Sequence, residues 1–220
     1  MTFPKAHRGV KFIFISELIA VLVSLIGIVS TTLSLLLGIN AISIEWGYVI
    51  LLTLVIVELS IPLICFVLRI IGLIIASGDE PYFKNGLFID IFALIMNVVE
   101  LLLVSLITNK DTSLAQTILD SVINGSSVAV MIYIIIGVSV LAQDLGYDKF
   151  ANRGNILIKM LIAICAFSIF LLFFTHFFKN PSPVMAEVLM YVELFSSIFE
   201  VLLYLLFVTY LARSLWILKK

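Results

Sequence analysis

Residues 156–178 read ILIKMLIAICAFSIFLLFFTHFF, and this stretch decides what kind of fold the chain adopts. A helix needs about 20 mostly apolar residues to cross the hydrocarbon core of a bilayer, and this run is long enough. Five further apolar runs extend roughly over Lys11–Gly38, Gly47–Ala76, Leu87–Ile107, Ser127–Ala142 (a short one) and Val184–Ala212. The sequence therefore predicts an all-α, polytopic membrane protein with six transmembrane helices.

The composition of the whole chain supports this class. Of its 220 residues, 63% are hydrophobic and 12% are charged, and the mean hydropathy is +1.26. Soluble domains average about 45–50% apolar and about 25% charged residues, so these few charges do not cover a soluble surface. The net charge of −1 argues against a nucleic-acid partner, which would require a basic face. The expected partner is the lipid bilayer.

The distribution of Lys and Arg predicts the orientation, because cytoplasmic connections carry an excess of basic residues. One side of the predicted membrane receives Lys5, Arg8, Lys11, Lys84, Lys149, Arg153, Arg213, Lys219 and Lys220. The other side receives only Lys110 and Lys179. We therefore expect a multi-pass protein of the cell membrane with both termini in the cytoplasm.

Two connections on the basic side resemble each other. Residues 70–84 (IIGLIIASGDEPYFK) align without gaps on residues 135–149 (IIGVSVLAQDLGYDK). In addition, a basic residue stands six positions before a charged one in three places, as in Lys11 and Glu17, Lys84 and Asp90, and Arg153 and Lys159. These patterns predict a single transmembrane domain, residues 1–220, built from three helical hairpin repeats at about 11–84, 86–153 and 155–220.

The aligned connections contain the candidate residues for contact with a partner. They are Asp79, Tyr82, Lys84, Asp144, Tyr147 and Lys149. Asp is common in turns and helix caps, and Tyr and Lys are common at the headgroup level of a membrane. These residues therefore form either interfacial turns that set the hairpin angle or a docking surface for a membrane-protein partner or a second copy of the chain.

Residues 111–123 (DTSLAQTILDSVI) are mildly amphipathic, with Leu114, Ile118 and Val122 on one helical face. We expect this segment to lie along the outer interface as a short separate helix.

Ionisable residues inside the predicted spans are the candidates for an ion or proton site, because charges in lipid are costly. They are Glu58, Arg69, Glu100, Glu193 and Glu200. At about 1.5 Å per helical residue, one layer in the outer half of the membrane contains Glu58, Glu100 and Glu193. Glu200 lies deeper. Asp90, Lys159 and His176 fall close to the surfaces and are expected to hydrate.

Two interpretations of the acid layer remain open. In the first, the acids are packing elements, with Arg69 paired to Glu200 and the others hydrogen-bonded to Ser or Asn side chains. In the second, Glu58, Glu100 and Glu193 line a hydrated path that binds protons or a cation. Four acids against one buried base are difficult to explain by pairing alone.

No enzyme motif, metal-ligand pattern or cofactor-binding loop occurs in the sequence. The two histidines, His7 and His176, are expected on opposite sides of the membrane, which disfavours a histidine-based metal centre. We expect no catalytic activity, no metal and no cofactor.

The segment GLIIASGDEPYFKNG, residues 72–86, resembles the corresponding segment of uncharacterised multi-pass membrane proteins of Gram-positive bacteria. The resemblance covers about a third of the chain and implies a bacterial cell-membrane location without implying an activity.

Three functions agree with these features. A small cation- or proton-dependent transporter or channel accounts for the intramembrane acids. A membrane scaffold or accessory subunit accounts for the short loops and the absence of motifs, and a lipid-binding protein accounts for the long spans and the 17 Phe residues.

Overall fold

The computed structural model describes residues 2–38, 44–106, 113–177 and 183–219, without the side chains of 24–38, 44–51, 54–55, 57–59, 104–106, 113, 183, 186, 190 and 193. Within these ranges the chain is helical, and none of the described residues forms a strand. The helices are α1 (Pro4–Gly38), α2 (Ile44–Ala76), α3 (Tyr82–Leu106), α4 (Ser113–Asp144), α5 (Asp148–Phe177) and α6 (Pro183–Leu218).

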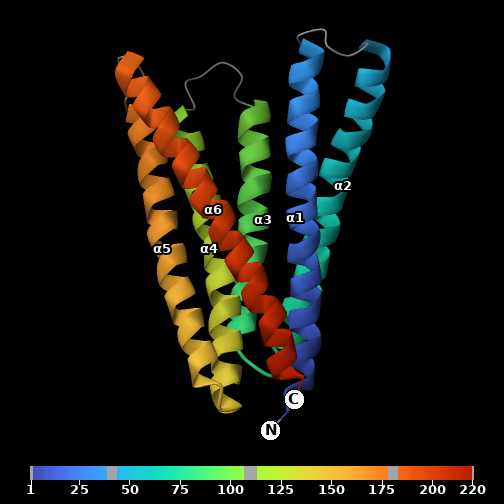
Figure 1. Ribbon diagram of the computed structural model, residues 1–220, viewed down its shortest axis with the longest axis vertical. Coiled ribbons are helices and arrows are strands. Elements are labelled where there is room, and N and C mark those ends of the chain that lie inside the picture. The colour runs from blue at the N-terminus through green and yellow to red at the C-terminus, as the bar shows by residue number, and fades with distance from the viewer. Residues whose placement is uncertain (1, 39–43, 107–112, 178–182, 220) are drawn as a thin grey trace.

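Successive helices run in opposite directions, so both ends of the chain lie at the same end of the bundle (Figure 1). α6 crosses the bundle obliquely, and its second half reaches the first half of α1. Among the described side chains, the buried core is concentrated at this terminal end. It includes Ile13, Leu73, Phe83, Ile134 and Phe207.

The predicted apolar runs match the helices closely, and the all-α class is confirmed. α1, α3 and α5 begin several residues before their apolar runs, because the polar residues of the terminal end continue the helix. In the described part of the chain, four helices are long and apolar enough to cross a membrane: residues 82–103, 114–144, 148–177 and 187–218. The described apolar part of α2 is shorter, Ser60–Ala76.

The expectation of a separate interfacial helix at residues 111–123 is wrong. From Ser113 onward this segment is the first third of α4, which continues without a break through Asn124 and Gly125. Two serine hydroxyls donate to carbonyls one turn back, Ser121 to Thr117 and Ser126 to Val122, both at 2.7 Å. Polar side chains in this stretch are thus satisfied within the helix, and α4 is much longer than the predicted run.

α1 and α2 approach each other through glycine. A methyl group placed on Gly9 would lie 2.4 Å from the carbonyl oxygen of Gly72 and 2.7 Å from the Ala76 side chain. Small residues let two helix backbones approach closely and are enriched where helices pack in membranes. This contact sets the α1–α2 distance at the terminal end and so positions the residues one to two turns farther along.

The two aligned connections follow different backbone paths. After α4, Gly146 adopts φ +80°, and Tyr147 N–H donates to the Ala142 carbonyl at 2.8 Å, as in a Schellman cap. After α2, Asp79 instead accepts a 2.7 Å hydrogen bond from the backbone N–H of Ala6 and caps the start of α1. Asp79 and Asp144 are therefore not structural equivalents, and the hairpin repeat is not confirmed.

Gly9→Ala should destabilise the protein by about 1–3 kcal/mol, because its methyl group meets backbone atoms that cannot move independently. Gly125→Ala is the matched control: it lies in α4 with nothing within 4 Å, and should stabilise by about 0.5–1 kcal/mol. Thermal unfolding of the purified protein in detergent measures both changes. Equal effects of the two substitutions would contradict the close approach.

Candidate functional site

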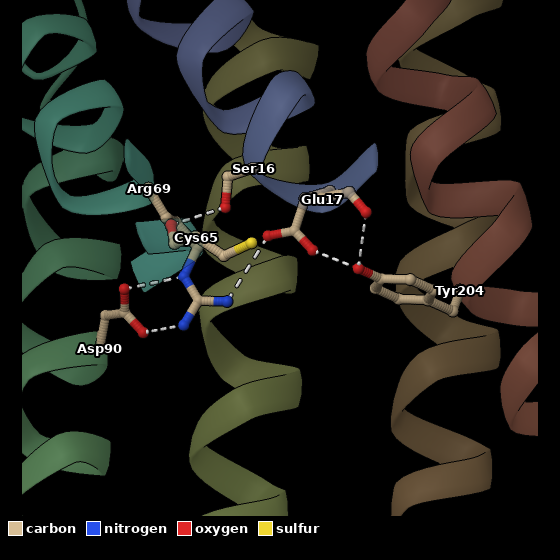
Figure 2. A network of polar contacts seen from close by, with 6 residues as sticks. All are labelled: Ser16, Glu17, Cys65, Arg69, Asp90 and Tyr204. Carbon is tan, nitrogen blue, oxygen red and sulfur yellow. Dashed lines mark hydrogen bonds and ion pairs between the residues drawn. The ribbon is translucent and has the colours of Figure 1, made fainter. Parts of the chain in front are cut away.

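Arg69 of α2 makes a two-point ion pair with Asp90 of α3 (Figure 2). Its Nη2 lies 2.6 Å from Asp90 Oδ1 and its Nε lies 2.9 Å from Asp90 Oδ2. Two parallel N–H···O bonds of this kind fix both the distance and the plane of the guanidinium. The pair joins α2 to α3 about two turns beyond the connection that links them.

Glu17 of α1 approaches the same guanidinium from the other side, with Oε1 3.5 Å from Arg69 Nη1. Its second oxygen accepts a 2.7 Å hydrogen bond from the hydroxyl of Tyr204 on α6, which also lies 3.2 Å from the Glu17 carbonyl. Ser16, next to Glu17, donates to the Cys65 carbonyl of α2 at 2.8 Å. One connected set of polar groups thus links α1, α2, α3 and α6.

The two acids of this network are buried and the base is not. The side chains of Glu17 and Asp90 are 5% and 2% exposed, whereas that of Arg69 is 30% exposed. Removing one partner from a buried ion pair leaves an uncompensated charge, which costs more than the pair contributes. The network therefore joins two acids to one base.

Two expectations from the sequence are wrong here. Arg69 does not pair with Glu200, because Asp90 and Glu17 occupy its guanidinium. Asp90 does not hydrate at the surface either: α3 begins at Tyr82, so Asp90 lies about 12 Å along the helix and inside the bundle. The signal that was available is the spacing of Lys11 to Glu17 and Lys84 to Asp90, which places both acids about two turns inside a basic residue.

A cleft of about 330 Å³ lies between α4, α5 and α6. Its polar lining residues are Asn124, Ser127, Cys165, Ser168, Glu200 and Tyr204. Its walls are otherwise aliphatic, with Met131, Leu161 and Ile164 among them. A second hollow of about 280 Å³ shares Asn124, Ser168 and Glu200 and continues past Thr175 and Ser197. We call the two together the α4–α6 groove.

Glu200 is the one acid that lines the described groove. Its carboxylate accepts a hydrogen bond from Ser168 of α5, and Ser168 also lies 3.3 Å from the hydroxyl of Ser196. The free thiol of Cys165 on α5 lies near this carboxylate. No described basic group forms an ion pair with Glu200, which lies about halfway along α6 and accepts its hydrogen bond from a neutral hydroxyl.

Tyr204 belongs to both features. Its side chain lines the groove one turn beyond Glu200, and its hydroxyl donates to the buried carboxylate of Glu17. The aromatic ring therefore stands between the groove and the Arg69 network, with a polar contact on the network side. Neither Tyr204 nor Glu17 was a candidate from the sequence, because the contact depends on the oblique path of α6 toward α1 (Figure 1).

The other predicted acids are placed only in part. Glu100 of α3 contacts the carboxyl group of Asp120 on α4, an acid that sequence reasoning did not select. The side chains of Glu58 and Glu193 lie outside the described residues, and so does any contact that they make.

The predicted interface residues are mostly at the surface of the terminal end. Tyr82, Lys84, Asp144 and Lys149 are exposed, whereas Asp79 is engaged as the α1 cap. Lys84 Nζ lies 5.8 Å from the centre of the Phe88 ring, within cation–π range.

Glu80, in the α2–α3 connection, is 8% exposed. Burial raises the pKa of its carboxyl group, and the charge of Asp144 adds to the rise against a weak bond from Tyr82 N–H. Ionisation of Glu80 therefore destabilises the folded state as the pH rises above the ordinary pKa of a glutamate side chain.

No protein-family model, no curated protein and no solved structure matches this chain. Within the described part of the chain, no three His, Cys, Asp or Glu side chains are grouped as a metal site would require.

Arg69→Met should destabilise the protein by about 3–5 kcal/mol, because it leaves Glu17 and Asp90 buried without a counter-charge. Replacing all three together, as Glu17→Met, Arg69→Met and Asp90→Leu, should restore most of that loss, since no buried charge remains. Denaturant unfolding in detergent measures both. A triple variant less stable than Arg69→Met would refute this account of the network.

Proposed function

We propose that the chain is an integral membrane protein whose six helices all cross the bilayer, with both termini in the cytoplasm. Large apolar side chains on the outer faces support this placement, among them Leu101, Phe170 and Val201, which are 59–71% exposed. Soluble proteins rarely expose contiguous apolar surface on this scale. The shared end for both termini and the basic residues there agree with an even number of spans.

The orientation is testable by cysteine labelling in a background that lacks Cys65 and Cys165. A membrane-impermeant maleimide should label Ser182→Cys in intact cells and should label Asn152→Cys only after the membrane is opened. The expected result follows from the distribution of basic residues. The opposite pattern of labelling would reverse the proposed topology.

Within this membrane protein, we propose that the α4–α6 groove is a transport path for protons or a cation. The observation that carries the proposal is the position of Tyr204, which lines the groove beside Glu200 and donates to Glu17. Ionisable side chains that face a cavity within a membrane are typical of substrate and proton pathways. In this proposal the ionisable groups of the path are Glu200 and the Arg69 network, in place of the predicted layer of three acids.

The chemistry available to these residues is proton or cation exchange. Glu200 faces the groove and has no described basic partner, and a carboxylate in such a position binds cations and exchanges protons. Tyr204 lies one turn from Glu200 on α6, and its hydroxyl donates a hydrogen bond to Glu17. Glu17 in turn faces Arg69, so Tyr204 connects the groove to the charges that join α1, α2 and α3.

The test is flux into liposomes that contain the purified protein and a pH-sensitive dye. Under an inside-negative potential, the protein should increase proton uptake over empty liposomes. Glu200→Gln should reduce this uptake at least tenfold, and Tyr204→Phe should reduce it while leaving the groove in place. Glu187→Gln, an exposed acid on the same helix that does not line the described groove, should not change it.

Uptake equal to that of empty liposomes, with and without added inorganic cations, would overturn the transport proposal. Uptake that survives Glu200→Gln unchanged would show that the path lies elsewhere in the bundle. The scaffold and lipid-binding functions do not predict a dependence on Glu200 in either case.

A further inference from the structure

We propose that the α4–α6 groove binds a small organic monocation, one with a single positive charge on a compact apolar body. This inference deepens the proposed transport function, on which it rests, by naming the class of substrate. It follows from three properties of the cleft: its size, its lining and the position of its one described acid.

The size of the cleft suits a small ligand. At about 330 Å³ it is at the lower end of the range for small-molecule sites. It lies between three helices, a common place for ligand sites in helical bundles. The occupant is therefore a compact molecule.

The lining separates one charge from a larger apolar surface. Glu200 and its hydrogen-bond partner Ser168 lie at one part of the wall, with Asn124 and Ser127 from α4. Aliphatic side chains such as Met131 and Ile164 make up much of the remainder. An ammonium group at Glu200 would leave the carbon atoms of the same molecule against this apolar surface, where burial is favourable.

The same lining argues against an inorganic ion. Calcium takes six to eight oxygen ligands and magnesium requires a near-octahedral set. The described groove offers one carboxylate and a few neutral oxygens, and no group of metal ligands. A quaternary ammonium does not need such a shell, because it is recognised by one negative charge and by an aromatic face. Tyr204 supplies an aromatic ring in the lining.

The charges around the acid fit the same class of ligand. The Cys165 thiol from α5 lies near the Glu200 carboxylate, whereas α4 contributes the neutral Asn124 and Ser127 to the lining. No described basic residue forms an ion pair with Glu200, so no described side chain takes the place of the positive charge of the ligand.

The experiment uses the full chain in detergent, with benzyltrimethylammonium as the probe and neopentylbenzene, its neutral carbon isostere, as the control ligand. Isothermal titration calorimetry should detect saturable binding of the cation and none of the isostere beyond partition into empty micelles. Glu200→Gln should weaken binding at least tenfold, and Glu187→Gln should leave it unchanged.

A second pair of variants tests the cleft without altering its charge. Val201 lines the cleft and is 59% exposed, so Val201→Trp should fill the space and abolish binding without disturbing the core. Val188→Trp, at an exposed position of the same helix outside the described cleft, is the control for folding and should bind as the wild type does.

The outcomes separate this inference from the proposed function. Proton uptake into liposomes without saturable binding of the cation, or equal binding of the neutral isostere, overturns the substrate class and leaves the transport function standing. Saturable, Glu200-dependent binding without any flux supports the site and overturns transport. Binding that Val201→Trp does not affect places the ligand elsewhere and overturns the inference.

Discussion

Pairing Arg69 with two buried carboxylates inside an apolar bundle is the constraint on which the rest of this structure depends. Separating either carboxylate from the guanidinium would leave it buried without a counter-charge, so α1, α2 and α3 are held at fixed distances around Arg69. Two features make the arrangement possible. Gly9 and Gly72 let α1 and α2 approach closely, and the Asp79 cap anchors the start of α1 against the α2–α3 connection.

Tyr204 extends this constraint to the last helix. The Glu17 carboxylate accepts a hydrogen bond from the Tyr204 hydroxyl. The oblique α6 therefore contacts α1 as well as its neighbour α5 (Figure 1). The core packs tightly at this end. The rings of Phe150 and Tyr210 stack with their centres 4.4 Å apart, and the hydroxyls of Ser139 and Tyr210 form a 2.8 Å hydrogen bond. The groove lies farther along α4, α5 and α6. A rigid terminal half thus supports a cleft whose one described acid is a single helical turn from the network.

The sequence predicts the helices well and their contacts poorly, for a physical reason. Runs of apolar residues report the length of each span, and the observed helices contain nearly all of each predicted run. Depth counted from the end of such a run is less reliable, because polar residues extend α3 by five positions and carry Asp90 from the expected surface into the core. The partners of Arg69 depend on which helices cross, and a single sequence does not contain the angle of α6. Local sequence similarity is unreliable for the same reason. The two aligned connections share Asp, Tyr and Lys, yet one turns at the positive φ of Gly146 and the other contacts α1 through Asp79.

The contact between Tyr204 and Glu17 is the central claim, since it joins the groove to the ion-pair network, and a double-mutant cycle measures it directly. The stabilities of the wild type, Tyr204→Phe, Glu17→Met and the double variant give the coupling free energy of the two side chains. A hydrogen bond to a charged group predicts a coupling of about 1.5–3 kcal/mol. Effects of the two substitutions that add within about 0.5 kcal/mol would show that the side chains do not interact, and would contradict the account.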